Sequence, residues 1–263
     1  MFERALHPVV HEFIAFGVKQ AYACIFGGAL LAAILVTHYW YPLEGLARYD
    51  FLFLYAIAVQ LVLLATRLES WQEAGVIIAF HLLATAMEIF KTSDAIRSWR
   101  YPGEFVFGIG NVPLFAGFMY SAVGSYLARV WRIHDFRFSA YPPQAPTLVI
   151  AALIYLNFFT HHFVWDLRWA LFAAIAWYYR RCWVYFKVLT VHRRMPLLLG
   201  FVLVALFIWF AENLATFAHI WLYPSQASGW VPVPLSKLGS WFLLMILSFV
   251  LVAALHRPKP PDA

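Results

Sequence analysis

The sequence predicts an all-α, polytopic membrane protein with about eight transmembrane helices, arranged as two parallel four-helix repeats. Three observations predict this fold class. First, the 263-residue chain is 63% hydrophobic and only 12% charged, whereas a soluble domain carries about 25% charged residues. Second, the chain contains apolar runs long enough for helices that cross a hydrocarbon core about 30 Å thick. Third, its second half repeats polar and aromatic residues of its first half in the same order.

The apolar runs follow one another with short polar segments between them, and each run predicts one membrane-spanning helix. The third and the sixth run carry charged residues within or beside them. The runs cover residues 15–37, 49–67, 74–91, 111–131, 146–164, 168–187, 196–219 and 233–255.

Lysine and arginine are unevenly distributed between the two ends of the predicted helices. If both termini are cytoplasmic, 12 of these residues, Arg4 among them, fall on the cytoplasmic side and 6 on the opposite side. Lys19 lies inside the first run. Because short cytoplasmic segments are enriched in Lys and Arg, the distribution predicts that the N-terminus and the C-terminus are both cytoplasmic.

One set of residues occurs twice. Thr37-His38 recurs 123 residues later as Thr160-His161, and Glu88 recurs 124 residues later as Glu212. Four spans per half is an even number, so both halves enter the membrane in the same orientation. The repeats cover about residues 15–131 and 146–255, joined by a Pro-rich cytoplasmic linker at 132–145, within a single membrane domain, 1–263. Further matches are Thr92, Trp99, Tyr101-Pro102 and Val112-Pro113-Leu114 with Thr216, Trp221, Tyr223-Pro224 and Val233-Pro234-Leu235.

Glu88 and Glu212 are the main catalytic candidates. A carboxylate inside a bilayer is costly unless it is paired, protonated or hydrated. We expect both to line a polar pocket between the halves, open to the extracytoplasmic side, where one Glu acts as an acid or a base. The alternative is that each Glu pairs with a basic residue or caps a helix, and so clamps the halves together. The polar residues on the same helix faces are His81, Lys91, Thr92, Thr216 and His219.

The densest ligand-like cluster is Thr160-His161-His162 with Asp166. Imidazoles and carboxylates bind Zn²⁺ or Fe²⁺, so His161, His162 and Asp166 form a conceivable metal site. However, neighbouring residues on a helix point about 100° apart, which argues against both imidazoles facing one ion. We therefore assign no metal, and we group His161 and His162 with the two Glu as catalytic candidates that orient or activate a substrate.

The predicted first extracytoplasmic loop is cationic, with Lys91 and Arg100 among its residues, whereas the second offers only Lys237 near its end. Such cations attract a phosphate or carboxylate group, and a solvated loop is the alternative. The asymmetry suggests that two ancestral sites have diverged. The candidate substrate-binding residues are Lys91, Arg100, Thr92, Thr216, His38, His81, Asn213, His219 and Lys237.

Several function classes are excluded by what the sequence lacks. Gly108-Ile109-Gly110 has neither the third glycine nor the preceding strand of a nucleotide-binding loop. The basic residues are spread over helix ends, so nucleic acid is not a predicted partner. Cys24 and Cys182 fall inside apolar runs and form no metal or disulfide motif.

Five blocks of the sequence are similar to a known family: Arg48-Tyr49-Asp50, Glu88-Ile89-Phe90-Lys91, Val112-Pro113-Leu114-Phe115-Ala116-Gly117-Phe118-Met119-Tyr120-Ser121, Asn157-Phe158-Phe159-Thr160-His161-His162 and Ala211-Glu212-Asn213. They resemble the YoaT-like bacterial integral membrane proteins, classed as a domain of unknown function, nearly from end to end. This resemblance implies a multi-pass protein of the bacterial inner membrane. More loosely, an intramembrane Glu followed by Val-Pro-Leu is similar to the carotenoid hydratase and lycopene cyclase membrane families, although the cyclases' Pro-x-Glu-Glu signature is missing in any clean form.

The polar residues favour an intramembrane enzyme or binder that handles a lipid or isoprenoid-like substrate. A small proton-coupled transporter or channel is the alternative, and a receptor or assembly factor is a third. The predicted partners are the lipid bilayer and a small hydrophobic substrate, whereas the sequence specifies no cofactor and no oligomeric state. Because predicted polar groups gather toward one face of the membrane, an enzyme or binder is favoured over a carrier, which needs access from both faces.

Overall fold

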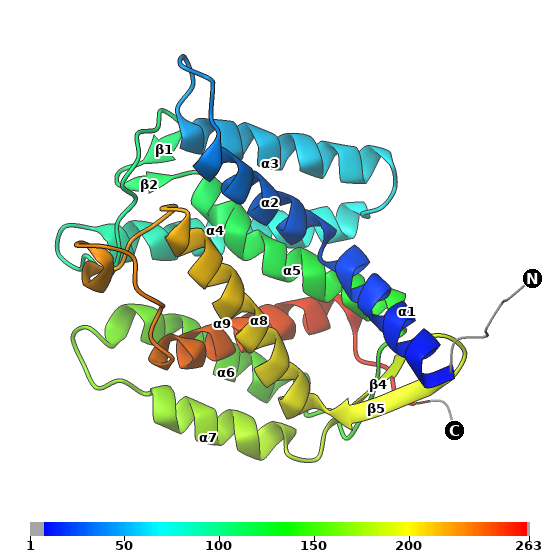
Figure 1. The fold of residues 1–263 in the computed structure, drawn as a ribbon. Coiled ribbons are helices and arrows are strands. Elements are labelled where there is room, and N and C mark those ends of the chain that lie inside the picture. Colours follow the sequence, from blue (N-terminus) through cyan, green and yellow to red (C-terminus); the bar gives the residue numbers. More distant parts are fainter. Residues whose placement is uncertain (1–7, 262–263) are drawn as a thin grey trace, which may run out of the picture.

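The computed structural model describes residues 8–261, so Arg4 lies outside the described residues. This part of the chain is predominantly helical, as predicted (Figure 1). In chain order the helices are α1 (Pro8–Ala23), α2 (Ile25–Tyr39), α3 (Arg48–Ala65), α4 (Trp71–Thr92), α5 (Phe115–Ile133), α6 (Gln144–Thr160), α7 (Arg168–Tyr179), α8 (Leu197–Phe217) and α9 (Ser236–His256), with a short 3-10 helix at Pro224–Gln226.

Each of the eight predicted runs contains a helix, but not every helix is long enough to cross a membrane. By length and composition, four are candidate spans: α3, α4, α8 and α9. A fifth would be α1 with α2, which meet at a bend of 72° beside Cys24. The apolar helix α6 has 17 residues, and the 12-residue α7 rises only about 18 Å. The described chain therefore contains four or five candidate membrane spans.

A three-stranded antiparallel sheet closes one end of the bundle, which we call the sheet end. It consists of β3 (Arg137–Ser139), β4 (Trp183–Lys187) and β5 (His192–Pro196), in the order β3-β4-β5. Because the chain forms β4 soon after α7, the apolar run predicted over 168–187 is helical only as far as Tyr179. The predicted linker at 132–145 likewise contains β3. The start of α1 and the end of α9 lie at this same end (Figure 1).

Helix α4 positions one of the candidate acids. Its first residue follows Ser70, whose hydroxyl accepts a hydrogen bond from the Glu73 amide, while the Glu73 carboxylate accepts one from the Ser70 amide. This capping box satisfies two amides that the first helical turn leaves free. Nearby, Arg129 and Glu69 form a fully buried ion pair at 3.1 Å. These contacts hold the start of α4 and the last turns of α5 in place near the sheet.

Helices α4 and α5 pack closely because α5 carries small residues where they cross. A Cβ atom on Gly124 would lie 2.5 Å from Cδ2 of Phe80. The Ser121 hydroxyl donates a hydrogen bond to the Ile77 carbonyl at 2.9 Å. Small residues permit such close approach of helix backbones. A two-stranded ribbon, β1 (Gly108–Ile109) with β2 (Val112–Pro113), leads the chain into α5.

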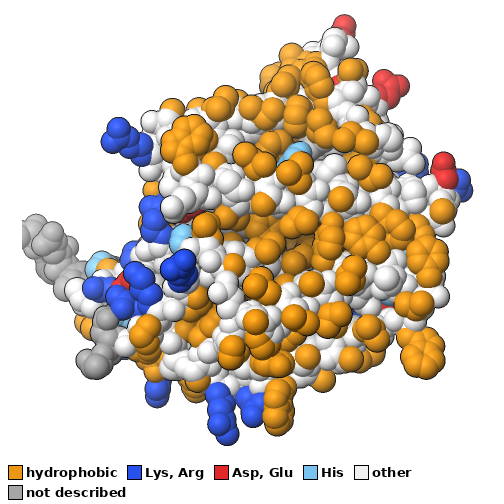
Figure 2. Space-filling view, turned by 180° about the vertical axis from the view of Figure 1, so that it is seen from behind, with side chains coloured by type: hydrophobic (Ala, Val, Ile, Leu, Met, Phe, Trp, Pro, Cys, Tyr) orange, Lys and Arg blue, Asp and Glu red, His pale blue; other side chains and the backbone are white. Residues whose placement is uncertain are grey.

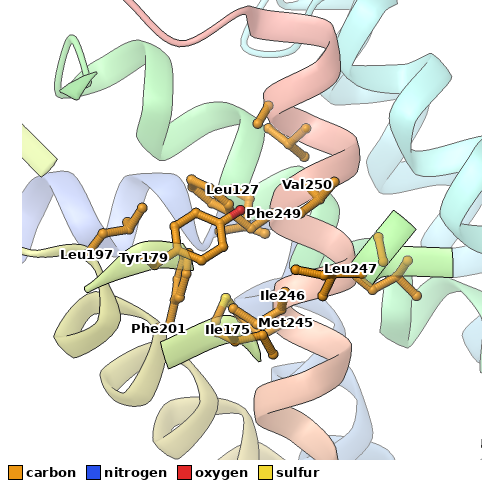
Figure 3. Packing of buried hydrophobic residues seen from close by; sticks show 14 of the residues in the cluster. Leu127, Ile175, Tyr179, Leu197, Phe201, Met245, Ile246, Leu247, Phe249 and Val250 are labelled. Atoms are coloured by element: carbon orange, nitrogen blue, oxygen red, sulfur yellow. The ribbon is translucent and has the colours of Figure 1, made fainter. Parts of the chain in front are cut away.

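Two clusters of buried apolar residues form the core. The larger one surrounds α9, where Phe249 packs between Phe201 of α8 and Trp131 of α5. Figure 3 shows Tyr179 of α7 reaching the same cluster. The smaller cluster joins α2 and α3 to the segment after α8. Outside the core, hydrophobic side chains cover most of one face, with Lys and Arg near its edges (Figure 2), which suits contact with lipid.

Candidate functional site

Glu88 lies in the last two turns of α4 and is 1% exposed. Its Oε2 accepts hydrogen bonds from the indole of Trp99 at 2.8 Å and from the hydroxyl of Tyr101 at 2.7 Å. Its Oε1 accepts one from the hydroxyl of Tyr120, on α5, at 2.6 Å. Three aromatic donors therefore hold this carboxylate, which offsets part of the free energy that its burial costs.

Glu212 lies at the matching place on α8 and is 2% exposed. The hydroxyl of Tyr223 donates to its Oε1 at 2.5 Å, and the indole of Trp241 donates to its Oε2 at 2.6 Å. Tyr223 corresponds to Tyr101 in the duplicated motif. Trp241 lies eight residues after Val233, as Tyr120 lies eight after Val112. The two carboxylates therefore have corresponding aromatic donors.

The aromatic donors of the two carboxylates also contact each other. The rings of Trp99 and Tyr223 lie 6.2 Å apart, and those of Tyr120 and Trp241 lie 5.9 Å apart. Arg100 exchanges two backbone hydrogen bonds with Leu222, so the central residues of the two Trp-x-Tyr motifs pair with one another. The two sites thus form one aromatic cluster at the end of the bundle opposite the sheet end, which we call the carboxylate end.

Neither carboxylate forms an ion pair within residues 8–261, because no Lys, Arg or His lies within ion-pair distance of Glu88 or Glu212 there, and Lys237 interacts with Glu212 only at longer range. For the described chain, the alternative of an ion-pair clamp is therefore wrong. Burial and the Glu88 carboxylate raise the pKa of Tyr101 well above its usual range, and burial and Glu212 do the same to the pKa of Tyr223. Both hydroxyls remain protonated donors.

A cavity of about 500 Å³ extends from the two carboxylates toward the sheet end. Its size is within the usual range of small-molecule sites. Its walls come from α1, α2, α5, α8 and α9, and they are mostly apolar. The wall residues that are exposed include Gly28 on α2 and Leu203 and Phe207 on α8, so the cavity opens sideways between these helices. At the carboxylate end the lining residues Trp221 and Tyr223 are buried.

None of the nine predicted substrate-binding residues lines this cavity. His81 faces Gly117 and Phe118 of α5. Thr92 and Thr216 donate hydrogen bonds to carbonyls of their own helices. The amide of Asn213 donates to the Trp209 carbonyl and accepts from the Val233 amide, which fixes the start of the last loop segment. His38 and His219 pack together at 5.5 Å where α2 meets the end of α8.

His161 and His162 form a second group, outside the cavity. Helix α6 ends at Thr160, and in the turn that follows both imidazoles face the same way, with ring centroids 4.1 Å apart. Expecting helical divergence between them was therefore wrong. Their Nε2 atoms lie 3.3 Å and 2.7 Å from the Lys91 ammonium. Asp166 instead contacts Asn157 and Arg168. Within residues 8–261 no group of three His, Cys, Asp or Glu could hold a metal ion.

The two remaining cations, Lys237 and Arg100, have different surroundings. Lys237 lies over the ring of Tyr223, with 4.2 Å from its Nζ to the ring centroid. Arg100 pairs with the opposite half through its backbone, and its side chain is exposed.

The aromatic donors Tyr120 and Trp241 were missed in the sequence. Their common spacing of eight residues from the duplicated Val-Pro could have identified them.

These features define a class: a helical membrane protein in which two buried carboxylates accept hydrogen bonds from Tyr and Trp side chains at one end of an apolar cavity. The chain belongs to the family described as "Protein of unknown function (DUF817)", whose match covers residues 12–249. It is 42% identical over 256 residues to the uncharacterized protein YoaT of Bacillus subtilis (strain 168), covering 97% of this chain and 94% of that protein. The predicted family is thus confirmed. The likeness to carotenoid enzymes is not shown, and no solved structure matches this chain.

Proposed function

We propose that the protein is an intramembrane enzyme or binder for an elongated apolar substrate, lipid-like or isoprenoid-like, in the bacterial inner membrane. The observation that carries this proposal is the pair of buried carboxylates at one end of an otherwise apolar cavity. From Glu212 to Gly200, α8 lines the cavity over twelve residues, or about 18 Å. Such a space suits a hydrocarbon chain, with a polar or reactive group placed between Glu88 and Glu212.

The proposed architecture is two parallel four-helix repeats with eight spans and both termini cytoplasmic. Matched packing supports it: α5 packs on α2 and α4 in the first half, as α9 packs on α6 and α8 in the second. Between the halves, α2 contacts α8 and α4 contacts α6, as a twofold relation requires. The reciprocal pairing of Arg100 with Leu222 would then lie near the axis.

This pseudo-symmetry is broken at the cavity. The corresponding space between α4, α5, α6 and α9 measures only about 20 Å³. With the offset of 124 residues, Val204 of the cavity corresponds to Phe80, and Ala211 corresponds to Met87. Larger side chains therefore fill the second space, and the Tyr155 hydroxyl donates to the Leu83 carbonyl beside it. We infer that one of two ancestral sites has remained open.

The chemistry that fits this site is proton transfer to or from a substrate group that is out of contact with water. A carboxyl group in apolar surroundings exchanges protons readily with a neighbouring base, and the tyrosine hydroxyls can stabilise either protonation state. Low local polarity strengthens each of these interactions. In this proposal Glu88 and Glu212 are the acid and base, and the aromatic donors orient them.

The proposal is tested by filling the cavity with the residue that occupies the matching position in the other half. Val204→Phe should reduce the amount of apolar ligand that co-purifies in mild detergent, measured by native mass spectrometry and untargeted lipid analysis. Val202→Phe is the matched control, because Val202 lies on the same helix with an exposed side chain outside the cavity wall. Equal retention by both folded variants would contradict the proposal.

A proton-coupled transporter or channel is the second candidate, and one observation favours it. The cavity carries polar groups far from the carboxylates, where the Tyr126 hydroxyl donates to Gln20 at 2.9 Å. Gln20 in turn contacts His134 at 3.2 Å. Proteoliposomes that enclose a pH-sensitive dye distinguish the two candidates: substrate-dependent acidification that Glu212→Gln abolishes would identify the transporter, and its absence would favour the enzyme or binder.

A further inference from the structure

Lys91 is a buried cation with no anionic partner in hydrogen-bond contact within residues 8–261. The residue is 4% exposed and lies in the last turn of α4. Its Nζ contacts only imidazoles, the Nε2 atoms of His161 and His162. A buried ammonium that lacks an anion is expensive, and natural proteins normally pair it. We therefore expect a negatively charged group to bind beside the Lys91 ammonium.

Other positive charges surround this position. Lys237 and Arg168 lie close enough to interact electrostatically with Lys91. The nearby carboxylate, Asp166, is already occupied: it pairs with the Arg168 guanidinium at 3.2 Å and accepts a hydrogen bond from the Asn157 amide at 3.1 Å. Lys237 also interacts electrostatically with Glu212, so three cations are set against two carboxylates, and the described side chains still leave an excess of positive charge here.

One of the two imidazoles can serve as an additional hydrogen-bond donor: each Nε2 accepts from the Lys91 ammonium, which leaves the Nδ1–H of His162 without a partner in residues 8–261. Desolvation, together with Lys91 and His161, lowers the pKa of His162 to about 4. The ring is therefore neutral near pH 7 and adds no charge to the three cations. His161 is oriented by the Asn157 carbonyl, which lies 2.7 Å from its Nδ1. The position of both rings is fixed by the end of α6.

We propose that Lys91, Lys237 and Arg168, with His162, form a binding site for a phosphate group at the carboxylate end, where His161 orients Lys91. Tetrahedral phosphate offers several acceptor oxygens and suits a ring of separate donors. Two sources share this chemistry, inorganic phosphate and the phosphodiester of a lipid headgroup. Exposed apolar residues beside His162, among them Phe163 and Trp165, would adjoin the acyl chains of a lipid.

This site is separate from the cavity, and the two proposals are independent. Lys237 packs on the ring of Tyr223, and the hydroxyl of that tyrosine bonds Glu212, which lines the cavity. Lys91 and both histidines are absent from the cavity wall. Filling the cavity with Val204→Phe should consequently leave phosphate binding unchanged.

The test measures binding of inorganic phosphate to the full-length protein in detergent by phosphorus NMR. A second measurement uses native mass spectrometry to count phospholipids retained after nanodisc reconstitution in phosphatidylcholine with or without phosphatidylglycerol. Lys91→Met and Lys237→Met should each weaken phosphate binding by about tenfold or more, the usual effect of losing one charge-assisted hydrogen bond. Arg97→Met is the control, because Arg97 is an exposed cation in the loop after α4.

The outcomes separate the two sources. Preferential retention of phosphatidylglycerol that both variants lose identifies a lipid headgroup, and phosphate binding without lipid preference identifies the free anion. Either result supports the site. The proposal is overturned if wild-type protein binds neither, or if folded Lys91→Met and Lys237→Met bind as well as Arg97→Met does.

Discussion

At the scale of single residues, the main feature is that both buried carboxylates accept hydrogen bonds from aromatic side chains and form no ion pair. Tyrosine and tryptophan combine an apolar ring with one polar hydrogen, so they can hold a carboxylate without bringing in a second charge. In the proposed function, this arrangement leaves Glu88 and Glu212 able to exchange a proton. An ion pair would keep them ionised and add a second buried charge.

Replacing Glu212 by Gln tests this arrangement. The amide keeps the size of the side chain but presents N–H groups to one of two donors, Tyr223 or Trp241. We expect the variant to fold, with a stability loss of about 1–3 kcal/mol, and to lose ligand retention or activity. Thermal unfolding in detergent and the retention assay check this. Glu44→Gln, at an exposed Glu, is the control. Full activity in folded Glu212→Gln would remove this Glu from the chemistry.

A second prediction at this scale concerns pH. The pKa of His162 is about 4 in the folded protein, against an ordinary value of 6.5. Between these values the unfolded chain binds more protons than the folded one, so stability rises as pH increases from about 4 to 6.5. The contribution of His162 to the free energy of unfolding is fully present above pH 6.5 and is lost as pH falls toward 4.

His162→Gln should flatten this part of the stability profile. The measurement is the unfolding midpoint of wild type and variant across that pH range, in the absence of phosphate. The difference between the two curves should grow with pH and then level off above pH 6.5. A difference that does not vary with pH would mean that His162 is as freely protonated in the folded state as in the unfolded state.

At the scale of elements, the positions of apolar helices could be predicted from the sequence, but their lengths could not. Apolar content fixes which segments are buried in lipid or core, so every predicted run contains a helix. The strand at Trp183–Lys187 is equally apolar in its first four residues, and only its pairing with β3 and β5 makes it a strand. Such pairing depends on residues 48 positions away, such as Arg137 opposite Tyr185, and local periodicity does not reveal it.

The candidate site could be predicted only in part, because a sequence reveals buried charge but does not reveal contacts between distant segments. Duplication identified Glu88 and Glu212, because buried charge is rare enough to be informative. It did not predict that His161 and His162 would leave the helix and face Lys91 together. The sequence predicted a polar pocket between the halves, open to the extracytoplasmic side, whereas the cavity in the structure is mostly apolar and opens sideways between α2 and α8, where Gly28 and Gly200 line it. Small residues that leave space for a cavity follow no periodic pattern that a single sequence could reveal.

The crossing of α4 and α5 gives a prediction for a pair of elements. Gly124→Ala would place a Cβ 2.5 Å from Phe80 and force the helices apart, with an expected cost of about 1–3 kcal/mol. Gly75→Ala, on the exposed side of α4 with no atom within 4 Å of the new Cβ, should stabilise by about 0.5–1 kcal/mol. Unfolding of both purified variants measures the difference. Equal effects would show that α4 and α5 can separate without penalty.

At the scale of the whole molecule, the proposed repeat architecture accounts for the position of the open cavity between α2 and α8. A twofold bundle should contain two equivalent spaces, one between α2 and α8 and one between α4 and α6. Only the first is open, and the bend between α1 and α2 lies on that side. Larger side chains on the other side strengthen the contact between the halves. The filled space thus stabilises the bundle that holds the open one.

This arrangement assigns opposite ends of the bundle to opposite sides of the membrane, which is the last prediction. Basic residues gather at the sheet end, where Arg180 and Arg181 follow α7 and Arg193 and Arg194 lie in β5, so this end should be cytoplasmic. In a Cys24→Ser, Cys182→Ser background, Arg97→Cys should react with an impermeant maleimide on intact bacteria. Arg181→Cys should react only after permeabilisation, because its exposed side chain lies at the sheet end. The reverse pattern would invert the bundle, and the carboxylates and the phosphate site would then face the cytoplasmic leaflet.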